Sequence, residues 1–255
     1  MNDAGRGNGS LDRQVAVVTG ASSGMGREIA VAMAAAGARV ALVGRSEERL
    51  AETAGEIAAA AGESLSVPVD LTGDRAAEEV VEAVTAGFGG IDCMVHGAGI
   101  FEVGPVDESL EMLDRQWLTN VRAPYRLTVA ALPALRHSRG NVIFFSSIAG
   151  KVGFPAAAAY CVTKGAVELA TKSLAVEEAP NGVRVNAIAP GNVETPMNAH
   201  LMAEPAYLEA MLAATPLGRN GRPADIVPLV LLLASGEGSW ITGQSFVVDG
   251  GWVAQ

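Results

Sequence analysis

The sequence predicts an α/β fold, a doubly wound parallel sheet of about seven strands with helices on both faces. Short apolar runs alternate with helix-like segments from residue 14 almost to the end of the chain. The runs are continuously apolar, which is typical of parallel strands buried on both faces. No linker, charge run or internal repeat divides the 255 residues, so one domain is expected.

The expected strands are short runs rich in β-branched residues, and several end at a glycine or an acidic residue. They cover residues 14–19, 39–43, 64–69, 93–96, 141–146, 184–188 and 245–248. The expected helices are Ala-rich or charged on one face, and several stop at glycine. They cover residues 27–36, 47–61, 75–88, 110–135, 157–179 and 223–234. Residues 1–12 are polar and Gly-rich, which predicts a flexible tail before a catalytic domain over 13–255. Residues 192–217 show the least regular pattern and predict a substrate flap.

Composition excludes several function classes. Apolar residues make up 49%, which rules out general disorder. The net charge of −10, with no dense basic run, disfavours a nucleic-acid partner. Cys93 and Cys161 lack metal-ligand spacing, so we expect free thiols and no metal site. There is no signal-like segment, and the apolar run 226–234 is too short for a membrane span, so we expect a cytoplasmic protein.

A glycine-rich segment joins the first strand to the first helix. It reads Thr19-Gly20-Ala21-Ser22-Ser23-Gly24-Met25-Gly26. Glycines permit a tight turn and a close backbone approach to a pyrophosphate, and the helix N-terminus offers free N–H groups. The strand before and the helix after this segment supply the context that a dinucleotide site requires.

The end of the second strand bears on which nicotinamide cofactor binds. An acidic residue there would bind the ribose hydroxyls and repel a 2′-phosphate, but this chain has Gly44, Arg45 and Ser46. Arginine suits phosphate contact, so we expect NADP(H) to be preferred over NAD(H). Alternatively, Arg45 and Ser46 simply start and cap the next helix. Asp70, after the third strand, is placed to meet the adenine or to cap the segment beyond Thr72.

Tyr160 and Lys164 are four residues apart on an expected helix and therefore share a face. A nearby ammonium favours phenolate and lowers a tyrosine pKa, which would suit acid–base work on an alcohol or a carbonyl. A serine at the end of the fifth strand could bind the substrate oxygen, and strand alternation leaves Ser146 and Ser147 both open.

Together these motifs resemble the short-chain dehydrogenase/reductase (SDR) family over nearly all of residues 14–251. The resemblance rests on Thr19-Gly20-x-x-x-Gly24-x-Gly26, Asp70, Gly97-Ala98-Gly99, Asn120, Ser147, Tyr160-x-x-x-Lys164, Pro190-Gly191, Thr195 and Asp249-Gly250-Gly251. It implies a Rossmann-type fold and an NAD(P)-dependent oxidoreductase, with Tyr160 as the acid–base and Ser147, rather than Ser146, bound to the substrate oxygen. It also implies that Lys164 lowers the tyrosine pKa and binds the nicotinamide ribose, and that Asn120 holds a relay water.

The cofactor residues that we expect combine the glycine motif with the resemblance. They are Gly20, Ser22, Ser23, Gly24, Met25, Gly26, Arg45, Ser46, Asp70, Leu71, Gly97, Ala98, Gly99, Tyr160, Lys164, Pro190, Gly191, Val193 and Thr195. Val193 and Thr195 would meet the nicotinamide carboxamide. One departure stands out: the family usually has Asn-Asn-Ala-Gly where this chain has His96-Gly97-Ala98-Gly99. We interpret His96 as structural, with a proton relay as the alternative.

The expected substrate is an apolar or cyclic ketone or secondary alcohol. Its pocket would comprise Ala149, Phe154, residues 101–106 and the flap residues 198–212, which carry few charges. The alternatives are a 3-oxoacyl-carrier-protein reductase, for which Arg136 and Arg139 mark a docking edge, an NAD-dependent alcohol dehydrogenase, and a non-catalytic nucleotide-binding regulator. The resemblance further implies a homotetramer that pairs the long helices across two-fold axes.

Overall fold

The computed structural model describes residues 11–255. Its seven strands form one parallel sheet in the order β3-β2-β1-β4-β5-β6-β7. They are β1 Val15–Thr19, β2 Arg39–Gly44, β3 Glu63–Pro68, β4 Cys93–His96, β5 Asn141–Phe145, β6 Arg184–Pro190 and β7 Ser245–Val248. The strand order reverses between β1 and β4, and in open α/β sheets such a switch point carries the ligand crevice at the carboxyl ends of the strands. The predicted fold class is confirmed.

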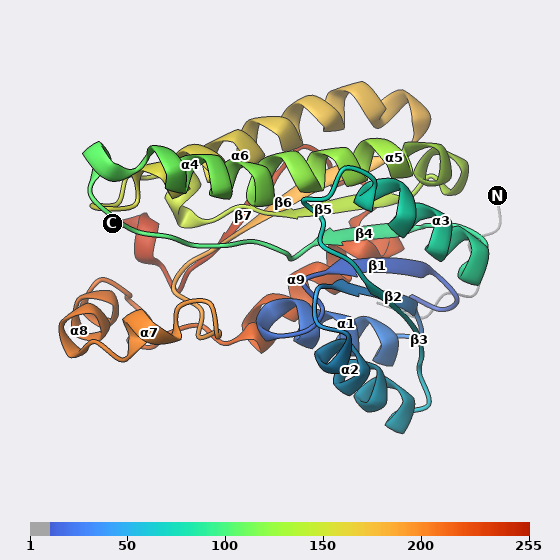
Figure 1. Cartoon of the computed structure of the whole chain (residues 1–255), viewed down its shortest axis with the longest axis horizontal. Helices are drawn as coiled ribbons and strands as arrows, with labels where there is room; N and C mark the ends of the chain where they lie inside the picture. Colours follow the sequence, from blue (N-terminus) through green and yellow to red (C-terminus); the bar gives the residue numbers. More distant parts are fainter. Residues whose placement is uncertain (1–10) are drawn as a thin grey trace.

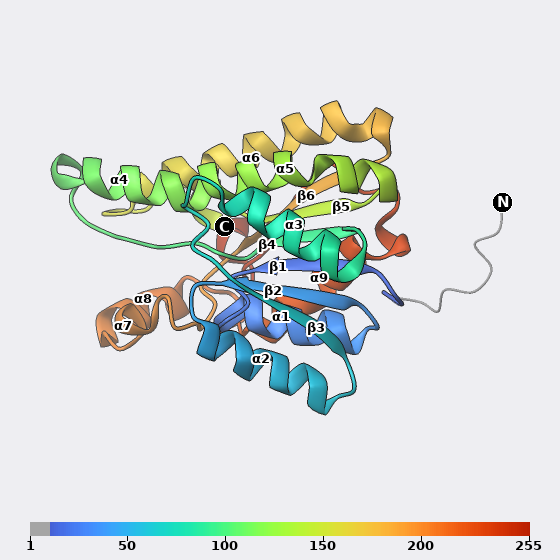
Figure 2. The same cartoon turned by 45° about the vertical axis from the view of Figure 1, so that its right-hand side comes forward.

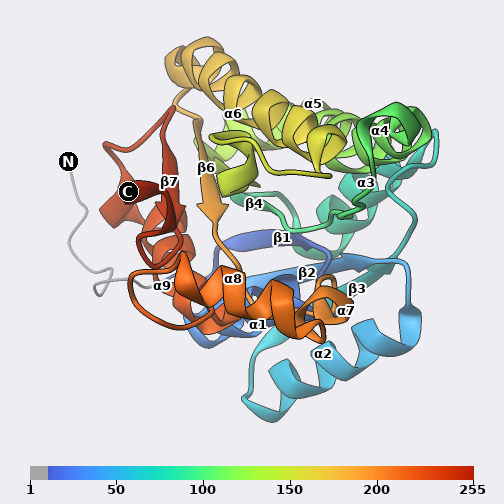
Figure 3. The same ribbon diagram turned by 90° about the vertical axis from the view of Figure 1, so that its left-hand side faces the viewer.

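Helices cover both faces of the sheet (Figures 1 and 2). One face carries α1 Gly24–Ala35, α2 Glu47–Ala59 and α9 Pro223–Ala234. The other carries α3 Ala76–Phe88, α5 Ala123–Ser138 and α6 Ala158–Glu178, with α4 Leu110–Trp117 leading into α5. Two shorter helices, α7 Ala199–Met202 and α8 Pro205–Ala213, lie beyond the carboxyl ends of the strands (Figure 3).

Alternation along each strand divides the core into two layers. On β1, Ala16 and Val18 pack toward α1 and α9, whereas Val15 and Val17 pack toward α3, α5 and α6. All four are at most 2% exposed. Both faces of the strand must therefore be apolar, which explains why the strand sequences show no polar alternation.

Three segments differ from the sequence prediction. The helix expected over 110–135 is interrupted by a π-helical turn, η2 Leu118–Arg122, and extends to Ser138. The flap is not irregular, because α7 and α8 form within it, and Pro205 opens α8 at a position where its missing N–H costs nothing. Leu11 is fully buried and its backbone N–H bonds Ala36, so the domain extends into the stretch assigned to the tail. Residues 1–10 of that tail lie outside the described part of the chain.

Candidate active site

The glycine segment after β1 folds as a turn that only glycine tolerates. Gly20 and Gly24 have φ values of +69° and +54°, which disfavour a side chain. A Cβ on Gly26 would lie 2.3 Å from the carbonyl oxygen of Gly20, and one on Gly97 would lie 2.7 Å from the carbonyl oxygen of Thr19. The glycines thus let the loops after β1 and β4 touch, and Thr19 Oγ1 accepts a hydrogen bond of 3.1 Å from the Ala98 N–H across that contact.

The N-terminus of α1 meets the requirements of a phosphate site. Ser23 stands at the N-cap without a side-chain cap bond, and the first turn holds no acidic residue. The first N–H groups of the helix are therefore without a side-chain acceptor, and the helix dipole favours an anion there. These observations fit the pyrophosphate of a dinucleotide.

The ends of β2 and β3 bring one cation and one carboxylate together. Arg45 is exposed, and no described residue pairs with its guanidinium. Its charge and two hydrogen bonds from Thr72 keep the pKa of Asp70 below its ordinary value, the Thr72 bonds being the larger cause. Asp70 therefore caps the turn at Thr72 and not α3, which begins at Ala76. Ser46 caps α2 by accepting from the Arg49 N–H, as the alternative interpretation predicted for that residue.

The remaining cofactor candidates also follow strand ends. Leu71 comes after β3, Gly97–Gly99 after β4, and Pro190 closes β6 ahead of Gly191, Val193 and Thr195. The Thr195 side chain would meet a Cβ on Gly24 at 3.4 Å. The loop after β6 thus lies beside the glycine turn, so the predicted cofactor residues share one edge of the sheet.

Ser147 and Tyr160 form the centre of the site. Ser147 follows β5, and Tyr160 lies in the first turn of α6. The two side chains are hydrogen-bonded to each other. Ser146 instead donates to the backbone oxygen of Lys164 at 3.2 Å, which leaves it no part in this pair. The structure therefore brings Ser147, rather than Ser146, to Tyr160.

Lys164 lies one helical turn below Tyr160. Its Nζ is 5.4 Å from the centre of the Tyr160 ring and donates to the Phe145 backbone oxygen at 2.7 Å. The residue is only 6% exposed, and burial lowers the pKa of its ammonium to about 8. The lysine is thus held by the strand that leads to Ser147.

The pKa of Tyr160 moves in the direction opposite to the sequence expectation. Burial raises it, and the hydrogen bond with Ser147 opposes that effect without cancelling it. Lys164 does not lower it in the chain alone, because its Nζ points to Phe145 and lies over the ring rather than at the hydroxyl. The phenol is therefore protonated at neutral pH and is a proton donor in its resting state.

Asn120 occupies the middle of the π-helical turn η2 and is 3% exposed. Its amide exchanges two hydrogen bonds with the backbone of Ile100, at 2.8 and 2.9 Å, and donates weakly to Thr163 beside Lys164. Such turns are frequent at functional sites. Asn120 therefore ties the loop after β4 to the Tyr160 helix.

A cavity of about 320 Å³ opens in front of Tyr160. It contains the predicted residues Ala149 and Phe154, parts of 101–106 and parts of the flap. No charged side chain occurs among the described residues that line it, which are Met25, Phe101, Val103, Ser146, Ser147, Ile148, Ala149, Phe154, Pro155, Ala156, Ala157, Tyr160, Pro190, Gly191, Asn192, Val193, Thr195, Met197, Asn198, Leu201, Tyr207 and Met211. A neutral, largely apolar molecule suits such walls.

Asparagines fasten the flap, and sequence reasoning did not single them out. Asn198 accepts from the backbone N–H and the hydroxyl of Thr195 and donates to Asn192 at 3.2 Å. Asn192 in turn donates to Asn220 at 3.0 Å. The sequence contained one usable signal, the three asparagines at positions 192, 198 and 220, but their mutual contacts depend on how the flap folds back.

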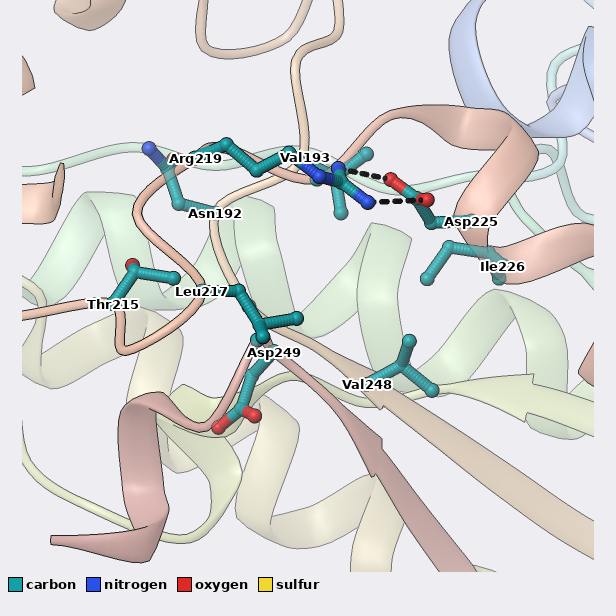
Figure 4. Close-up of a pocket in the computed structure, with 12 residues that line it drawn as sticks. Asn192, Val193, Thr215, Leu217, Arg219, Asp225, Ile226, Val248 and Asp249 are labelled. Atoms are coloured by element: carbon teal, nitrogen blue, oxygen red, sulfur yellow. Dashed lines mark hydrogen bonds and ion pairs between the residues drawn. The ribbon is translucent and has the colours of Figure 1, made fainter.

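Asn192 also lines a smaller cavity of about 240 Å³ (Figure 4). Arg219 projects into it and forms a two-pronged ion pair with Asp225, with distances of 2.7 and 2.8 Å. This pair neutralises Arg219 and Asp225. The third charged side chain of the cavity, Asp249, accepts hydrogen bonds of 2.8 Å from the backbone N–H groups of Gly251 and Val253, so all three charged groups are engaged within the fold.

His96 is 3% exposed and stacks on Phe144, with ring centres 4.8 Å apart. Its Nε2 bonds the Thr128 hydroxyl at 2.8 Å, and burial lowers its pKa to about 3. The ring is thus neutral at physiological pH, which supports the structural interpretation. In the described residues Cys93 and Cys161 are free thiols, no His, Cys and carboxylate cluster could hold a metal, and no helix is long and apolar enough to span a membrane.

Known proteins match this fold and this arrangement along the whole domain. A family model described as "Enoyl-(Acyl carrier protein) reductase" matches residues 20–253. Cyclopentanol dehydrogenase from Comamonas testosteroni is 37% identical over 248 residues, which is 96% of this chain and 99% of that protein. The chain belongs to the short-chain dehydrogenase/reductase family. It is therefore an NAD(P)-dependent oxidoreductase.

Further SDR relatives extend the likeness. The 2,5-dichloro-2,5-cyclohexadiene-1,4-diol dehydrogenase of Sphingobium indicum is 35% identical over 244 residues, covering 95% of this chain and 97% of that protein. A gluconate 5-dehydrogenase structure from Beutenbergia cavernae, described with bound NADP, has a TM-score of 0.93 at 37% identity and covers 98% of this chain and 100% of its own. An alcohol dehydrogenase structure from Sinorhizobium meliloti has a TM-score of 0.93 at 34% identity and covers 97% of this chain and 99% of its own.

Proposed function

We propose that this SDR protein is an NADP(H)-dependent reductase of neutral ketones, with Tyr160 as the catalytic acid–base. The observation that carries the proposal is the pairing of a half-buried, protonated Tyr160 with Ser147 at the wall of a cavity without charged side chains. Asn120 and Lys164 would complete the catalytic set.

The glycine turn would hold the pyrophosphate of the dinucleotide, whose nicotinamide would supply or take the hydride. The chain's own residues handle the oxygen. Ser147 and Tyr160 would both bind the carbonyl oxygen, which polarises the carbonyl and orients it. As negative charge develops there, Tyr160 gives up its proton to that oxygen. Lys164 would hold the nicotinamide ribose, and from that position its ammonium would stabilise the phenolate that remains; in the chain alone, its bond to Phe145 keeps it away from the Tyr160 hydroxyl.

The Tyr160→Phe variant tests the reaction class. It removes the proton donor and retains the ring, so turnover of every ketone should fall by about 10²-fold or more, while the nucleotide still binds. A non-catalytic regulator would lose nothing. Unchanged turnover in Tyr160→Phe would contradict the assignment.

Arg45 supports the preference for NADP(H). Its exposed, unpaired guanidinium follows β2, where the adenosine ribose binds in this fold. Titrating NADPH and NADH side by side should give at least about tenfold tighter binding of NADPH, a difference of about 1.4 kcal/mol. Arg45→Ala should remove that difference. Arg49→Ala, an exposed arginine one turn further along α2, is the matched control and should keep it.

The cavity supports an apolar or cyclic substrate. The cyclopentanol and cyclohexadienediol dehydrogenases among the relatives act on cyclic alcohols according to their names. NADPH consumption should therefore be fast with cyclopentanone or cyclohexanone and slow with a ketone dicarboxylate, whose charges find no partner in the cavity. A preference for the dicarboxylate would refute this substrate class.

Carrier docking at Arg136 finds less support. Arg136 forms bonds of 2.8 and 2.6 Å with Glu178, so its charge is already paired. The long helix α6 instead exposes an apolar stripe of Val162, Leu169 and Val176, which are 52, 69 and 79% exposed. This stripe supports a homotetramer that packs α6 across a two-fold axis. A monomer in sedimentation at micromolar concentration would remove that assignment.

A further inference from the structure

One polar side chain of the substrate cavity has no part in the proposed reaction. Tyr207, on α8, lines the same cavity as Tyr160 and Ser147. It is half-buried, and burial raises its pKa. Tyr207 is therefore a neutral phenol at neutral pH, set among apolar walls, and its hydroxyl is available only for hydrogen bonding.

The other polar groups around the cavity are already engaged. Ser146 donates to the Lys164 backbone, and the Thr195 hydroxyl donates to Asn198. Ser147 and Tyr160 are paired at the reaction centre. Tyr207 is the remaining hydroxyl-bearing residue that lines the cavity, and it belongs to α8 of the flap.

Asn192 fixes the direction of the Tyr207 proton. The Asn192 amide is held on both sides, donating to Asn220 at 3.0 Å and accepting from Asn198 at 3.2 Å. Its oxygen therefore has a defined position, and the Tyr207 hydroxyl donates to it at 3.4 Å. A phenol has one proton to donate, and its oxygen can also accept. With the proton directed to Asn192, and no donor to the Tyr207 oxygen among the described residues, the accepting side of that oxygen is open.

We infer that Tyr207 is a second substrate-binding group, which accepts a hydrogen bond from a hydroxyl group remote from the reacting carbonyl. The inference rests on the proposed ketone reduction and narrows its substrate class to neutral cyclic hydroxyketones and the corresponding diols. A hydroxyl group on the substrate supplies the hydrogen-bond donor that the Tyr207 oxygen lacks. An ether oxygen at the same place brings only acceptors and gains nothing. A charged group would lose its hydration in a cavity that supplies no opposite charge.

The test compares ketones that differ only at the remote group. The full chain is assayed with NADPH and with cyclohexanone, the 3- and 4-hydroxycyclohexanones and their methoxy counterparts. For at least one ring position, kcat/KM of the hydroxyketone should exceed that of the methoxyketone by about three- to tenfold, the value of one neutral hydrogen bond. This comparison needs only the unaltered protein, so it does not depend on a variant folding.

Tyr207→Phe removes the accepting oxygen and should bring the hydroxy-to-methoxy ratio of kcat/KM to about one. The ratio is unaffected by any uniform change in flap closure. Tyr125→Phe is the matched control, since Tyr125 is exposed on α5 away from the cavity, and it should keep the ratio of the unaltered protein. Turnover of cyclohexanone in each sample shows that the variant is folded.

Three results would overturn the inference. If cyclohexanone is reduced but hydroxyl and methoxyl groups are treated alike, or if Tyr207→Phe keeps the preference, Tyr207 is not a subsite and the proposed function stands. If no ketone is reduced with either nicotinamide, both the proposed function and the subsite fail.

Discussion

Replacing Lys164 with methionine should make the protein more stable at neutral pH while removing the catalytic role that we propose for Lys164. Lys164 is buried, and its pKa falls from the ordinary 10.5 to about 8. At about 1.36 kcal/mol per pKa unit, burying the ammonium at pH 7 costs about 3 kcal/mol. Methionine has a similar length and no charge. Leaving the Phe145 oxygen without its donor costs about 1–3 kcal/mol, so a net gain of up to about 2 kcal/mol is expected.

The pH dependence is the sharper part of this prediction. Because the folded-state pKa is lowered, the folded chain releases the Lys164 proton from about pH 8 upward, whereas the unfolded chain keeps it up to 10.5. The unaltered protein therefore gains stability between these values, and the methionine variant does not. The titration of Tyr160 contributes to the stability of both proteins, and this contribution cancels in the difference between them. The difference in the free energy of unfolding between the methionine variant and the unaltered protein should therefore fall by about 3 kcal/mol from pH 7 to pH 10.5 and change sign.

Urea unfolding of both proteins at pH 7, 9 and 10.5 measures this difference. Lys172→Met, at an exposed lysine on the same helix, is the control and should show no comparable change with pH. A stability difference between Lys164→Met and the unaltered protein that stays constant from pH 7 to 10.5 would refute the reasoning. It would mean that the buried amine is not the titrating group.

Two further substitutions test the glycine turn and the Arg136 ion pair. Gly26→Ala places a carbon about 2.3 Å from the Gly20 oxygen, so the backbone must shift. The melting temperature of this variant should fall, and its affinity for the nucleotide should drop about tenfold or more. In the control variant Gly55→Ala, nothing lies near the added Cβ, so the free energy of unfolding, measured by thermal denaturation, should rise by about 0.5–1 kcal/mol. Arg136 lowers the pKa of Glu178 below 4.5, so the pair stabilises at neutral pH and is lost as pH falls through that lowered value. Glu178→Gln should therefore melt earlier than the unaltered protein at pH 7, and this deficit should shrink as the pH falls below 4.5. A deficit that stays the same at acidic pH would exclude the charge as the cause.

The sequence predicted the fold because its signals are local. Continuous apolar runs mark strands buried on both faces, and glycines mark turns that no other residue can adopt, as Gly20 and Gly26 show. Four-residue spacing places Tyr160 and Lys164 on one helix face whatever surrounds them. These features depend on backbone sterics and periodicity, so the strands, the glycine turn and the helix that carries Tyr160 and Lys164 could be predicted from the sequence.

Only the tertiary structure decided how these groups behave. It separated Ser147 from Ser146 by bonding the latter to the Lys164 backbone, and it reversed the expected direction of the Tyr160 pKa. It also brought Tyr207 and Asn192, fifteen residues apart, into one hydrogen bond. Burial and the direction of a hydrogen bond depend on which distant segments fold against a side chain. The sequence alone therefore determined which residues reach the site, and the packing of the flap and of α6 determined their protonation and their partners.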